Sequence, residues 1–219
     1  SPTLWATLIL GAVSSGCVAF DVSAPSIDLW ASNEPHPSLK SLPNLILLTM
    51  FNFHYINRSL IFPLRMRGGK PMPLSVMFFA WAFCTVNGYL QVRYLTFLYV
   101  YPDEWLYDPR FIVGVAIFLF GWCLNYDADD RLRNLRKPGE TGYKIPYGGL
   151  FEYVSGANFC GEIIEWTGFA IAGWSIPSIT FAIFTFLNTA PRGAAHHKWY
   201  LSKFDDYPKN RKAVIPFIW

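Results

Sequence analysis

Three polar side chains recur on one face of an apolar segment past the middle of the chain. Asn158, Glu162 and Glu165 stand at positions i, i+4 and i+7, so a helix through this segment places all three on one stripe. Carboxyl groups inside a segment of membrane length are costly, and by default they mark a polar cavity or a bound ligand. Hydrogen bonding between helices is the alternative, and it suits a single Asn or Glu165 alone. The three together predict a ligand cavity.

A basic loop, residues 131–144, precedes the stripe. Asn125, Asp129 and Arg136 are expected to share a helical face where the preceding apolar segment leaves the membrane. The amide and the carboxylate suit ribose hydroxyls or a carboxamide, and the arginine suits a phosphate in fork geometry. For the basic residues alone, charge that flanks a membrane helix on the positive side is the alternative.

Two adjacent histidines, His196 and His197, follow the last apolar run. They suit a nicotinamide or a pyrophosphate, and equally a wetted membrane interface. Neighbouring residues of a regular helix cannot both face one metal ion, so no metal site is expected. Gly156 and Gly161 have the spacing of a phosphate loop, but the Lys and Ser/Thr of that motif are absent after them. No Gly-x-Gly-x-x-Gly follows a strand, so any nucleotide must be bound by the helices themselves.

The elements that must position these groups are membrane helices. Of the 219 residues, 53% are hydrophobic and 15% are charged, against about 25% charged in a soluble domain. The sequence predicts a single all-helical membrane domain over residues 1–219. Each apolar run is long enough, or nearly so, to cross about 30 Å of hydrocarbon, and these runs cover residues 3–20, 44–63, 73–99, 110–126, 150–173 and 175–191. The four cysteines, at positions 17, 84, 123 and 160, lie within these runs and are expected to be small buried fillers.

The distribution of charge orients the helices. Lys and Arg gather at 65–70, 131–144 and 192–212, whereas the connection 101–108 is acidic. By the positive-inside rule the basic loops and the C-terminus face the cytoplasm. No basic residue precedes the first run, which predicts a retained membrane helix rather than a signal peptide. Residues 21–43 contain four prolines, so whether they span decides the side of the N-terminus.

Several long stretches resemble the steroid 5α-reductase family. One runs from Leu135-Arg136-Lys137-Pro138-Gly139-Glu140 through Tyr143-Lys144-Ile145-Pro146, Gly148-Gly149-Leu150-Phe151 and Tyr153-Val154-Ser155-Gly156-Ala157-Asn158 to Glu162-Ile163-Ile164-Glu165-Trp166. The C-terminal stretch contains Tyr200, Tyr207-Pro208-Lys209, Arg211-Lys212 and Ile215-Pro216-Phe217-Ile218. Shorter matches are Asn87-Gly88, Tyr101-Pro102-Asp103 and Asn125. An arginine that some family members carry before the Asn-Gly pair is Phe79 here.

The resemblance implies a bundle of about seven membrane helices around a nucleotide and steroid cavity. It implies hydride transfer from NADPH to the 4,5 double bond of a 3-oxo-Δ4 steroid, which gives the 5α-reduced 3-oxosteroid. The family's catalytic pair, which contacts the 3-oxo oxygen, falls on Glu34 and Tyr55. Its nucleotide-contacting positions fall on Arg58, Lys70, Asn125, Asp129, Arg136, Tyr143, Lys144, Asn158, Glu162, His196 and Tyr200.

The chemistry of an enone agrees with this assignment. Hydride attack on the β-carbon pushes negative charge onto the carbonyl oxygen, and a donor held there lowers the barrier. Tyr55 offers a phenol hydroxyl, and Glu34 in a low-dielectric site would stay protonated and donate as well. Otherwise Tyr55 is an interfacial aromatic residue and Glu34 a solvated loop acid.

Other functions remain open on the sequence alone. A related bundle could reduce another enone, a polyprenol or an enoyl lipid, or could methylate a lipid-like substrate. A transporter is the alternative of a different class, although the paired repeats of many transporters are absent. The expected partners are the steroid and membrane lipids, with no nucleic acid and no obligate protein partner. The expected location is a bacterial inner membrane or the endoplasmic reticulum membrane, with the nucleotide site on the cytoplasmic side.

Overall fold

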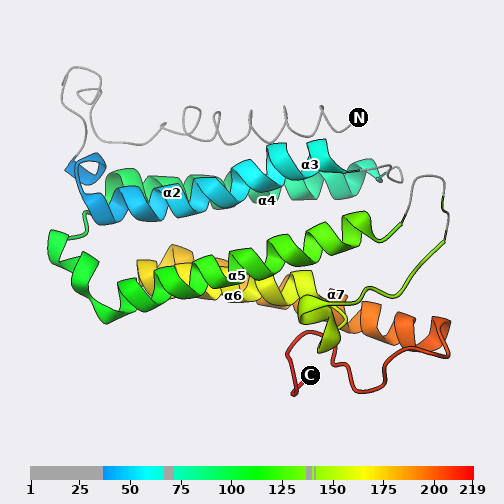
Figure 1. Ribbon diagram of the computed structural model, residues 1–219. Helices are drawn as coiled ribbons and strands as arrows, with labels where there is room; N and C mark the ends of the chain where they lie inside the picture. Colours follow the sequence, from blue (N-terminus) through cyan, green and yellow to red (C-terminus); the bar gives the residue numbers. More distant parts are fainter. Residues whose placement is uncertain (1–36, 67–71, 137–139, 141) are drawn as a thin grey trace. The chain divides into compact units, whose positions relative to one another are not determined.

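The computed structural model describes residues 37–66, 72–136, 140 and 142–219. The chain divides into two compact units, residues 1–108 and 109–219. In the part of the chain that is described, the regular elements are helices (Figure 1). One isolated β-bridge pairs Val154, in the loop before α6 (Ala157–Gly173), with Lys212, in the C-terminal segment. The expected all-helical class is therefore confirmed for these residues. The predicted run at 3–20 and the uncertain region up to residue 36 lie outside them.

The described part of the first unit starts with a short 3₁₀ turn, η2 (Pro37–Leu39), and the helix α2 (Leu42–Ile56). The helix continues without a break through a π-helical segment, η3 (Asn57–Ile61), into α3 (Phe62–Arg65). A proline in the first turn of α2 suits a helix start, because the backbone N–H that it lacks has no intrahelical partner there. The predicted run at 44–63 is thus one helical rod with a π segment near its end.

The second rod of this unit is α4 (Leu74–Arg93), continued by the π-helical η4 (Tyr94–Leu98) and followed by the 3₁₀ turn η5 (Asp103–Tyr107). Asn44, near the start of α2, ties the two rods together. Its Nδ2 donates to the carbonyl oxygens of Leu95 and Tyr99, each at 2.7 Å. These carbonyls belong to the end of a helix and have no intrahelical donor, so the buried amide satisfies them.

Close helix packing builds the second unit. Its first two α-helices are α5 (Pro109–Asn134) and α6 (Ala157–Gly173). A Cβ placed on Gly121 of α5 would lie 2.2 Å from the backbone nitrogen of Glu165, and one on Gly161 of α6 would lie 2.5 Å from that of Asn125. Small residues let membrane helices approach until their backbones touch. These contacts fix α6 and its polar side chains against α5.

A tight connection turns the chain from α6 into α7 (Ile176–Lys203). Trp174 adopts φ 39° at the end of α6, in the left-handed region that commonly ends a helix. Ser175 and Ser178 then form a reciprocal capping box at the start of α7. The helix extends beyond the predicted apolar run, which ended at residue 191, and so carries the two histidines on regular helix.

The C-terminal segment, residues 204–219, folds back onto the loop before α6. Ser155 N donates to Lys212 O at 2.8 Å, Lys212 N donates to Tyr153 O at 2.8 Å, and Gly156 N donates to Ala213 O at 2.9 Å. Val154 and Val214 are buried in the core cluster at this junction. The loop before α6, which contains the 3₁₀ turn η6 (Gly149–Glu152), is thereby fixed by backbone hydrogen bonds.

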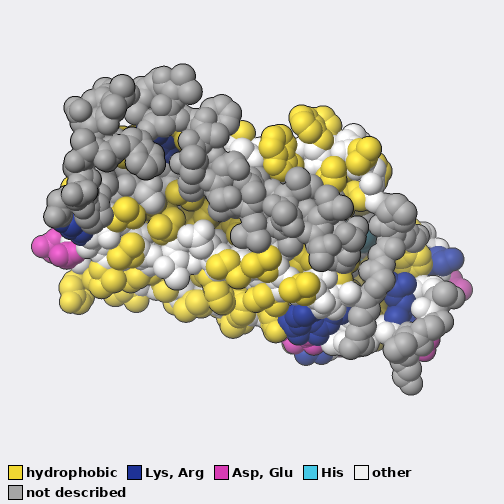
Figure 2. All heavy atoms as spheres, turned by 90° about the horizontal axis from the view of Figure 1, so that it is seen from above, with side chains coloured by type: hydrophobic (Ala, Val, Ile, Leu, Met, Phe, Trp, Pro, Cys, Tyr) yellow, Lys and Arg dark blue, Asp and Glu magenta, His cyan; other side chains and the backbone are white. Residues whose placement is uncertain are grey.

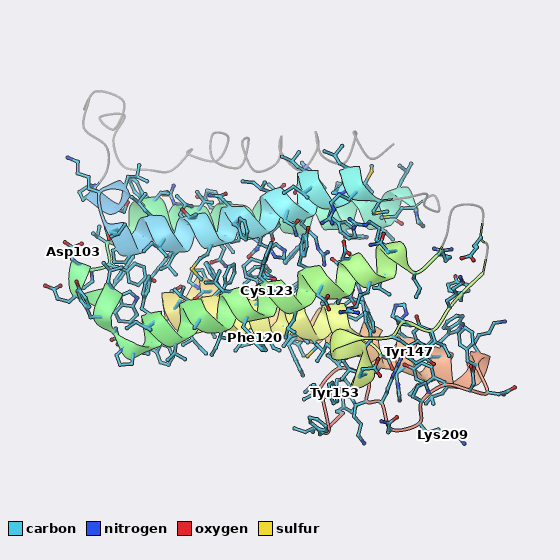
Figure 3. The ribbon with its side chains drawn as sticks, in the orientation of Figure 1. Asp103, Phe120, Cys123, Tyr147, Tyr153 and Lys209 are labelled. Atoms are coloured by element: carbon cyan, nitrogen blue, oxygen red, sulfur yellow. The ribbon has the colours of Figure 1, made fainter. Side chains whose placement is uncertain are left out.

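Two of the described helical segments, Leu74–Leu98 and Pro109–Asn134, are long and apolar enough to cross a membrane. Hydrophobic side chains cover much of the described surface on the face shown in Figure 2. Phe120 and Cys123 are both exposed on α5 (Figure 3). The expectation that the cysteines are buried fillers is therefore wrong for Cys123, although Cys160 is buried. Cys123 lies on a part of α5 where other apolar side chains, Leu119 and Phe120, are exposed as well.

Candidate functional site

Tyr55 of α2 takes part in a chain of hydrogen bonds that crosses to α4. Asn87 donates through Nδ2 to the Tyr55 hydroxyl oxygen at 3.2 Å, and Gln91 donates through Nε2 to Asn87 Oδ1 at 3.3 Å. Both amides are buried, whereas Tyr55 is half-buried. Because Asn87 occupies a lone pair of the phenol oxygen, the Tyr55 proton is directed away from Asn87. The hydroxyl is thus arranged as a donor toward another group.

The other predicted residues of the first unit are Arg58, Glu34 and Lys70. Arg58 lies in η3, half-buried, with its guanidinium carbon 5.2 Å from the centroid of the Phe62 ring. A cation over an aromatic face is stabilised there. Glu34 and Lys70 lie outside the described residues.

Within the second unit, Asn125 and Asn158 meet. Asn125 is buried on α5 and donates through Nδ2 to the Asn158 carbonyl oxygen at 2.8 Å. Asp129 follows one turn later and is half-buried. Arg136 is exposed and stands after the end of α5 at Asn134, so the expectation that it shares the helical face of Asn125 and Asp129 is wrong. The helix stops before it reaches the loop that carries Arg136.

The polar stripe on α6 divides into two parts. Asn158 and Glu162 are half-buried near the start of the helix. Glu165 has no exposed surface, and its backbone lies against Gly121 of α5. A glutamate buried in the tight α5/α6 contact is what we expect if Glu165 forms hydrogen bonds between helices rather than binding a ligand. Asn158 and Glu162 are therefore the two members that remain accessible to a ligand.

The loop after α5 carries an aromatic residue that packs against α7, followed in the sequence by an exposed cation. The ring centroids of Tyr143 and Trp199 are 4.7 Å apart, in an edge-to-face arrangement. Lys144 is exposed and paired with Glu140. An exposed ion pair of this kind contributes little to stability, so Lys144 can exchange Glu140 for another anion at small cost.

The two histidines of α7 have different surroundings. His196 is exposed, with its ring centroid 5.8 Å from that of Phe159 on α6. His197 is half-buried, and its Nδ1 lies 2.6 Å from the hydroxyl of Ser155. Burial, followed by the charge of Lys212, lowers the pKa of His197 from its ordinary value. His197 is therefore a neutral internal hydrogen-bonding group, and His196 is the histidine that can reach a ligand.

Tyr200 lies one turn after His196 and is half-buried. Its ring stacks on that of Tyr207, with centroids 5.2 Å apart and planes inclined by 10°. Burial is the largest cause that raises the pKa of Tyr200, and the neighbouring Tyr207 also raises it. The phenol stays protonated at neutral pH and serves as a hydrogen-bond donor.

The second unit thus holds most of the predicted nucleotide-contacting residues on connected elements. Hydrogen bonds and ring contacts join α5 to α6, α6 to α7, and the loop after α5 to α7. Among the described residues there is no cluster of three His, Cys, Asp or Glu side chains of the kind that holds a metal ion. The sequence did not point to Asn87 and Gln91 as partners of Tyr55, or to Ser155 and Tyr207 as partners of the α7 residues, because these pairings join distant positions.

Comparison with known proteins identifies the family. The family model described as 3-oxo-5-alpha-steroid 4-dehydrogenase matches residues 70–219. The chain belongs to this family. The chain is 55% identical to 3-oxo-5-alpha-steroid 4-dehydrogenase 1 of Bos taurus over 197 residues, which are 90% of this chain and 77% of that protein. It is 56% identical to the type 1 protein of Homo sapiens, with 85% of this chain and 72% of the relative covered.

The type 2 branch of the 3-oxo-5-alpha-steroid 4-dehydrogenase family is also similar. The Homo sapiens type 2 protein is 50% identical over 181 residues, covering 83% of this chain and 71% of the relative. The region matched by the family model contains the whole second unit and α4. The expected family is therefore confirmed, and together with the two apolar helices it identifies a membrane protein.

Proposed function

We propose that the chain is a multi-pass membrane reductase that uses NADPH to reduce the 4,5 double bond of a 3-oxo-Δ4 steroid to the 5α product. The observation that carries the proposal is the 50–56% identity to proteins named 3-oxo-5-alpha-steroid 4-dehydrogenase. A name of this kind specifies the bond and the carbonyl position of the substrate. The proposed bundle has about seven membrane helices, with the nucleotide on the side of the basic loops.

The first unit supplies the group for the steroid oxygen. When the double bond is reduced at its β-carbon, negative charge develops on the 3-oxo oxygen. Tyr55 would donate its proton to that oxygen, since Asn87 already donates to the phenol oxygen at 3.2 Å. A donor held where charge develops contributes about 3 kcal/mol to the stability of the transition state. Glu34 would be the second donor, and a protonated carboxyl in an apolar site is suited to that role.

The second unit has a donor set that fits a dinucleotide phosphate. Arg136 and Lys144 are exposed cations on one loop, and His196 and Tyr200 share a helical face four residues apart. Arginine binds phosphate oxygens through the planar fork of its N–H groups, and lysine binds them as a compact charge. On α6, the half-buried Asn158 and Glu162 suit the hydroxyls and amide of the nucleotide. Bound NADPH would supply a hydride, and these side chains would hold and orient it.

The remaining proposed contacts complete this assignment. Arg58 and Lys70 would serve the nucleotide from the first unit. Asn125 and Asp129 would serve it from α5, where the Asn125 amide N–H already bonds to Asn158 and its oxygen is the atom left for a ligand. Tyr143 would line the site through the contact of its ring with Trp199.

An isotope experiment tests the reaction and its donor together. The full-length chain is reconstituted with a Δ4-3-ketosteroid and NADPH deuterated at C4 of the nicotinamide. Deuterium is expected on the steroid β-carbon, with the α-proton from solvent. Tyr55→Phe keeps the ring and removes the hydroxyl, so kcat is expected to fall by about two orders of magnitude.

Nucleotide affinity is the control for this experiment. Tyr55→Phe is expected to bind NADPH as the wild type does, because the phenol acts on the steroid. Deuterium at the α-carbon, or near-normal turnover in Tyr55→Phe, would contradict the proposed mechanism. Absence of NADPH binding by the wild type would contradict the proposed function.

A further inference from the structure

Tyr207 stands where three segments of the second unit meet. Its side chain is only 3% exposed. Its hydroxyl lies 2.6 Å from the hydroxyl of Ser155, in the loop before α6. Its ring stacks on Tyr200 of α7 at 5.2 Å. A single side chain after the end of α7 therefore touches both the last turns of that helix and the loop that leads into α6.

A buried cation lies close to the Tyr207 ring. The guanidinium carbon of Arg211 lies 5.3 Å from the Tyr207 ring centroid and 4.7 Å from that of Tyr147. Arg211 is 2% exposed and donates to the Pro146 carbonyl oxygen at 2.9 Å. Its Nε and Nη2 have no hydrogen-bond partner among the described residues. Two aromatic faces and one carbonyl thus hold this charge, which fixes the Tyr207 ring between Arg211 and Tyr200. Figure 3 shows Tyr147 beside this end of α7.

The hydroxyl of Tyr207 adds a second restraint. Ser155 Oγ lies 2.6 Å from both the Tyr207 hydroxyl and His197 Nδ1. The three groups form a short relay that joins the loop before α6, the C-terminal segment and α7. Because His197 is held on one side of α7, the rotation of the helix about its axis is fixed. The neighbouring face, with His196 and Tyr200, is fixed with it.

We propose that Tyr207 is a positioning residue that presets the Tyr200 ring for the nucleotide. The inference rests on the proposed function, in which Tyr200 contacts NADPH. Tyr200 lies in the last turn of a helix that ends at Lys203, where a side chain without support loses order. A ring that is already stacked in its bound orientation loses little conformational entropy when the ligand arrives. Tyr207 acts through Tyr200 and does not touch the nucleotide.

A double-mutant cycle tests this inference in the full-length chain. Equilibrium binding of NADPH is measured for the wild type, Tyr207→Leu, Tyr200→Leu and the double variant. Aromatic stacking beyond burial is worth up to about 1.5 kcal/mol, so Tyr207→Leu is expected to weaken NADPH binding by about tenfold. In the Tyr200→Leu background the same change is expected to have no further effect, because the residue through which it acts is gone.

Two conservative variants separate positioning from general stability. Tyr207→Phe keeps the stacked ring and is expected to bind NADPH within about threefold of the wild type. Tyr207→Met fills much of the ring's volume without stacking and is expected to behave like Tyr207→Leu. If the leucine variant does not fold, Tyr207→Met replaces it in the double-mutant cycle. Steroid affinity is expected to be unchanged in all of them.

The outcomes distinguish the two proposals. If the wild type binds NADPH but Tyr207→Leu weakens binding equally with and without the Tyr200 ring, or does not weaken it, Tyr207 is not a positioning residue and the proposed function stands. If the wild type does not bind NADPH, the proposed function fails and the inference fails with it. Non-additive weakening that Tyr207→Phe rescues supports both.

Discussion

At the scale of single residues, the hydrogen bond that Tyr55 receives is as informative as the residue itself. A tyrosine hydroxyl can donate one proton and accept two hydrogen bonds. In this chain the buried amides of Gln91 and Asn87 form a chain of donors that ends on the phenol oxygen. Each donor withdraws charge from the next acceptor, so the phenol becomes a stronger donor in turn. Asn87 therefore belongs to the chemistry proposed for Tyr55.

Replacing Asn87 tests this direction of donation. Asn87→Leu removes the donor and is expected to lower kcat by about tenfold, the equivalent of one hydrogen bond of about 1.4 kcal/mol, with NADPH affinity unchanged. Asn87→Asp substitutes an acceptor of the same shape, which would draw the Tyr55 proton toward itself. We expect it to lower kcat more than the leucine variant, as measured by steady-state turnover of a Δ4-3-ketosteroid.

Thr85→Val is the matched control, because the hydrogen bond of the Thr85 hydroxyl among the described residues stays within α4, to the Trp81 carbonyl oxygen at 3.0 Å. Its turnover is expected to be normal. Turnover in Asn87→Asp equal to that of the wild type would show that the amide does not direct the phenol proton.

At the scale of the elements, close contact between α5 and α6 holds the candidate nucleotide residues in register. Asn125 meets Asn158 because Gly161 lets α6 approach until a Cβ there would lie 2.5 Å from the Asn125 nitrogen. Gly121 likewise lets α5 approach the backbone of Glu165 on α6. Backbone atoms cannot move aside as flexible side chains can, so an added methyl group must push the helices apart.

The expected consequence is a loss of stability on adding one methyl group. Gly121→Ala places a Cβ 2.2 Å from the Glu165 nitrogen and is expected to destabilise the protein by about 1–3 kcal/mol or more. Thermal unfolding in detergent measures the effect. Gly88→Ala is the matched control, since a Cβ there has no neighbour within 4 Å in the described part of the chain. Alanine is favoured over glycine in a helix by up to about 1 kcal/mol, so this variant is expected to be as stable as the wild type or more so. Equal stability of the two variants would mean that the α5/α6 contact is looser than described.

The sequence predicts these elements well where hydropathy decides them. The runs predicted at 73–99 and 110–126 correspond to the segments Leu74–Leu98 and Pro109–Asn134. It fails where other interactions set the ends. α6 begins at Ala157 rather than near 150, because Ser155 and Gly156 donate to the C-terminal segment instead of continuing a helix. α7 continues to Lys203, well past its apolar part, because helix formation does not require an apolar sequence.

At the scale of the whole molecule, the candidate site depends on pairings between distant parts of the chain. The bond from Asn87 to Tyr55 spans 32 residues, and the contact of Ser155 with Tyr207 spans 52. Periodicity and spacing report only neighbours within one element, so neither pairing can be predicted from them. The turn at residues 215–218 could not be predicted from these patterns either. Phe217, which follows a proline, adopts φ 66° at a position where such a turn usually has glycine. That the candidate residues form one site stays a prediction, which rests on the resemblance to the family.

Two titratable residues of α7, His197 and Tyr200, are expected to make the stability of the protein depend on pH. Burial and Lys212 lower the pKa of His197 from 6.5, so the folded protein resists the protonation that the unfolded chain accepts. This contribution is present above about pH 6.5 and is lost as the pH falls through the lowered pKa. Burial and Tyr207 raise the pKa of Tyr200 from 10.0. Its contribution is present below pH 10 and is lost as the pH rises through the raised pKa.

The expected result is a plateau of stability between about pH 6.5 and pH 10, with an acidic and an alkaline limb. Thermal unfolding midpoints measured across this range in detergent give the curve. His197→Gln is expected to flatten the acidic limb and leave the alkaline one, and Tyr200→Phe is expected to do the reverse. His196→Gln is the matched control, because that ring is exposed one residue away on the same helix. An acidic limb as steep in His197→Gln as in the wild type would mean that other groups control acid unfolding.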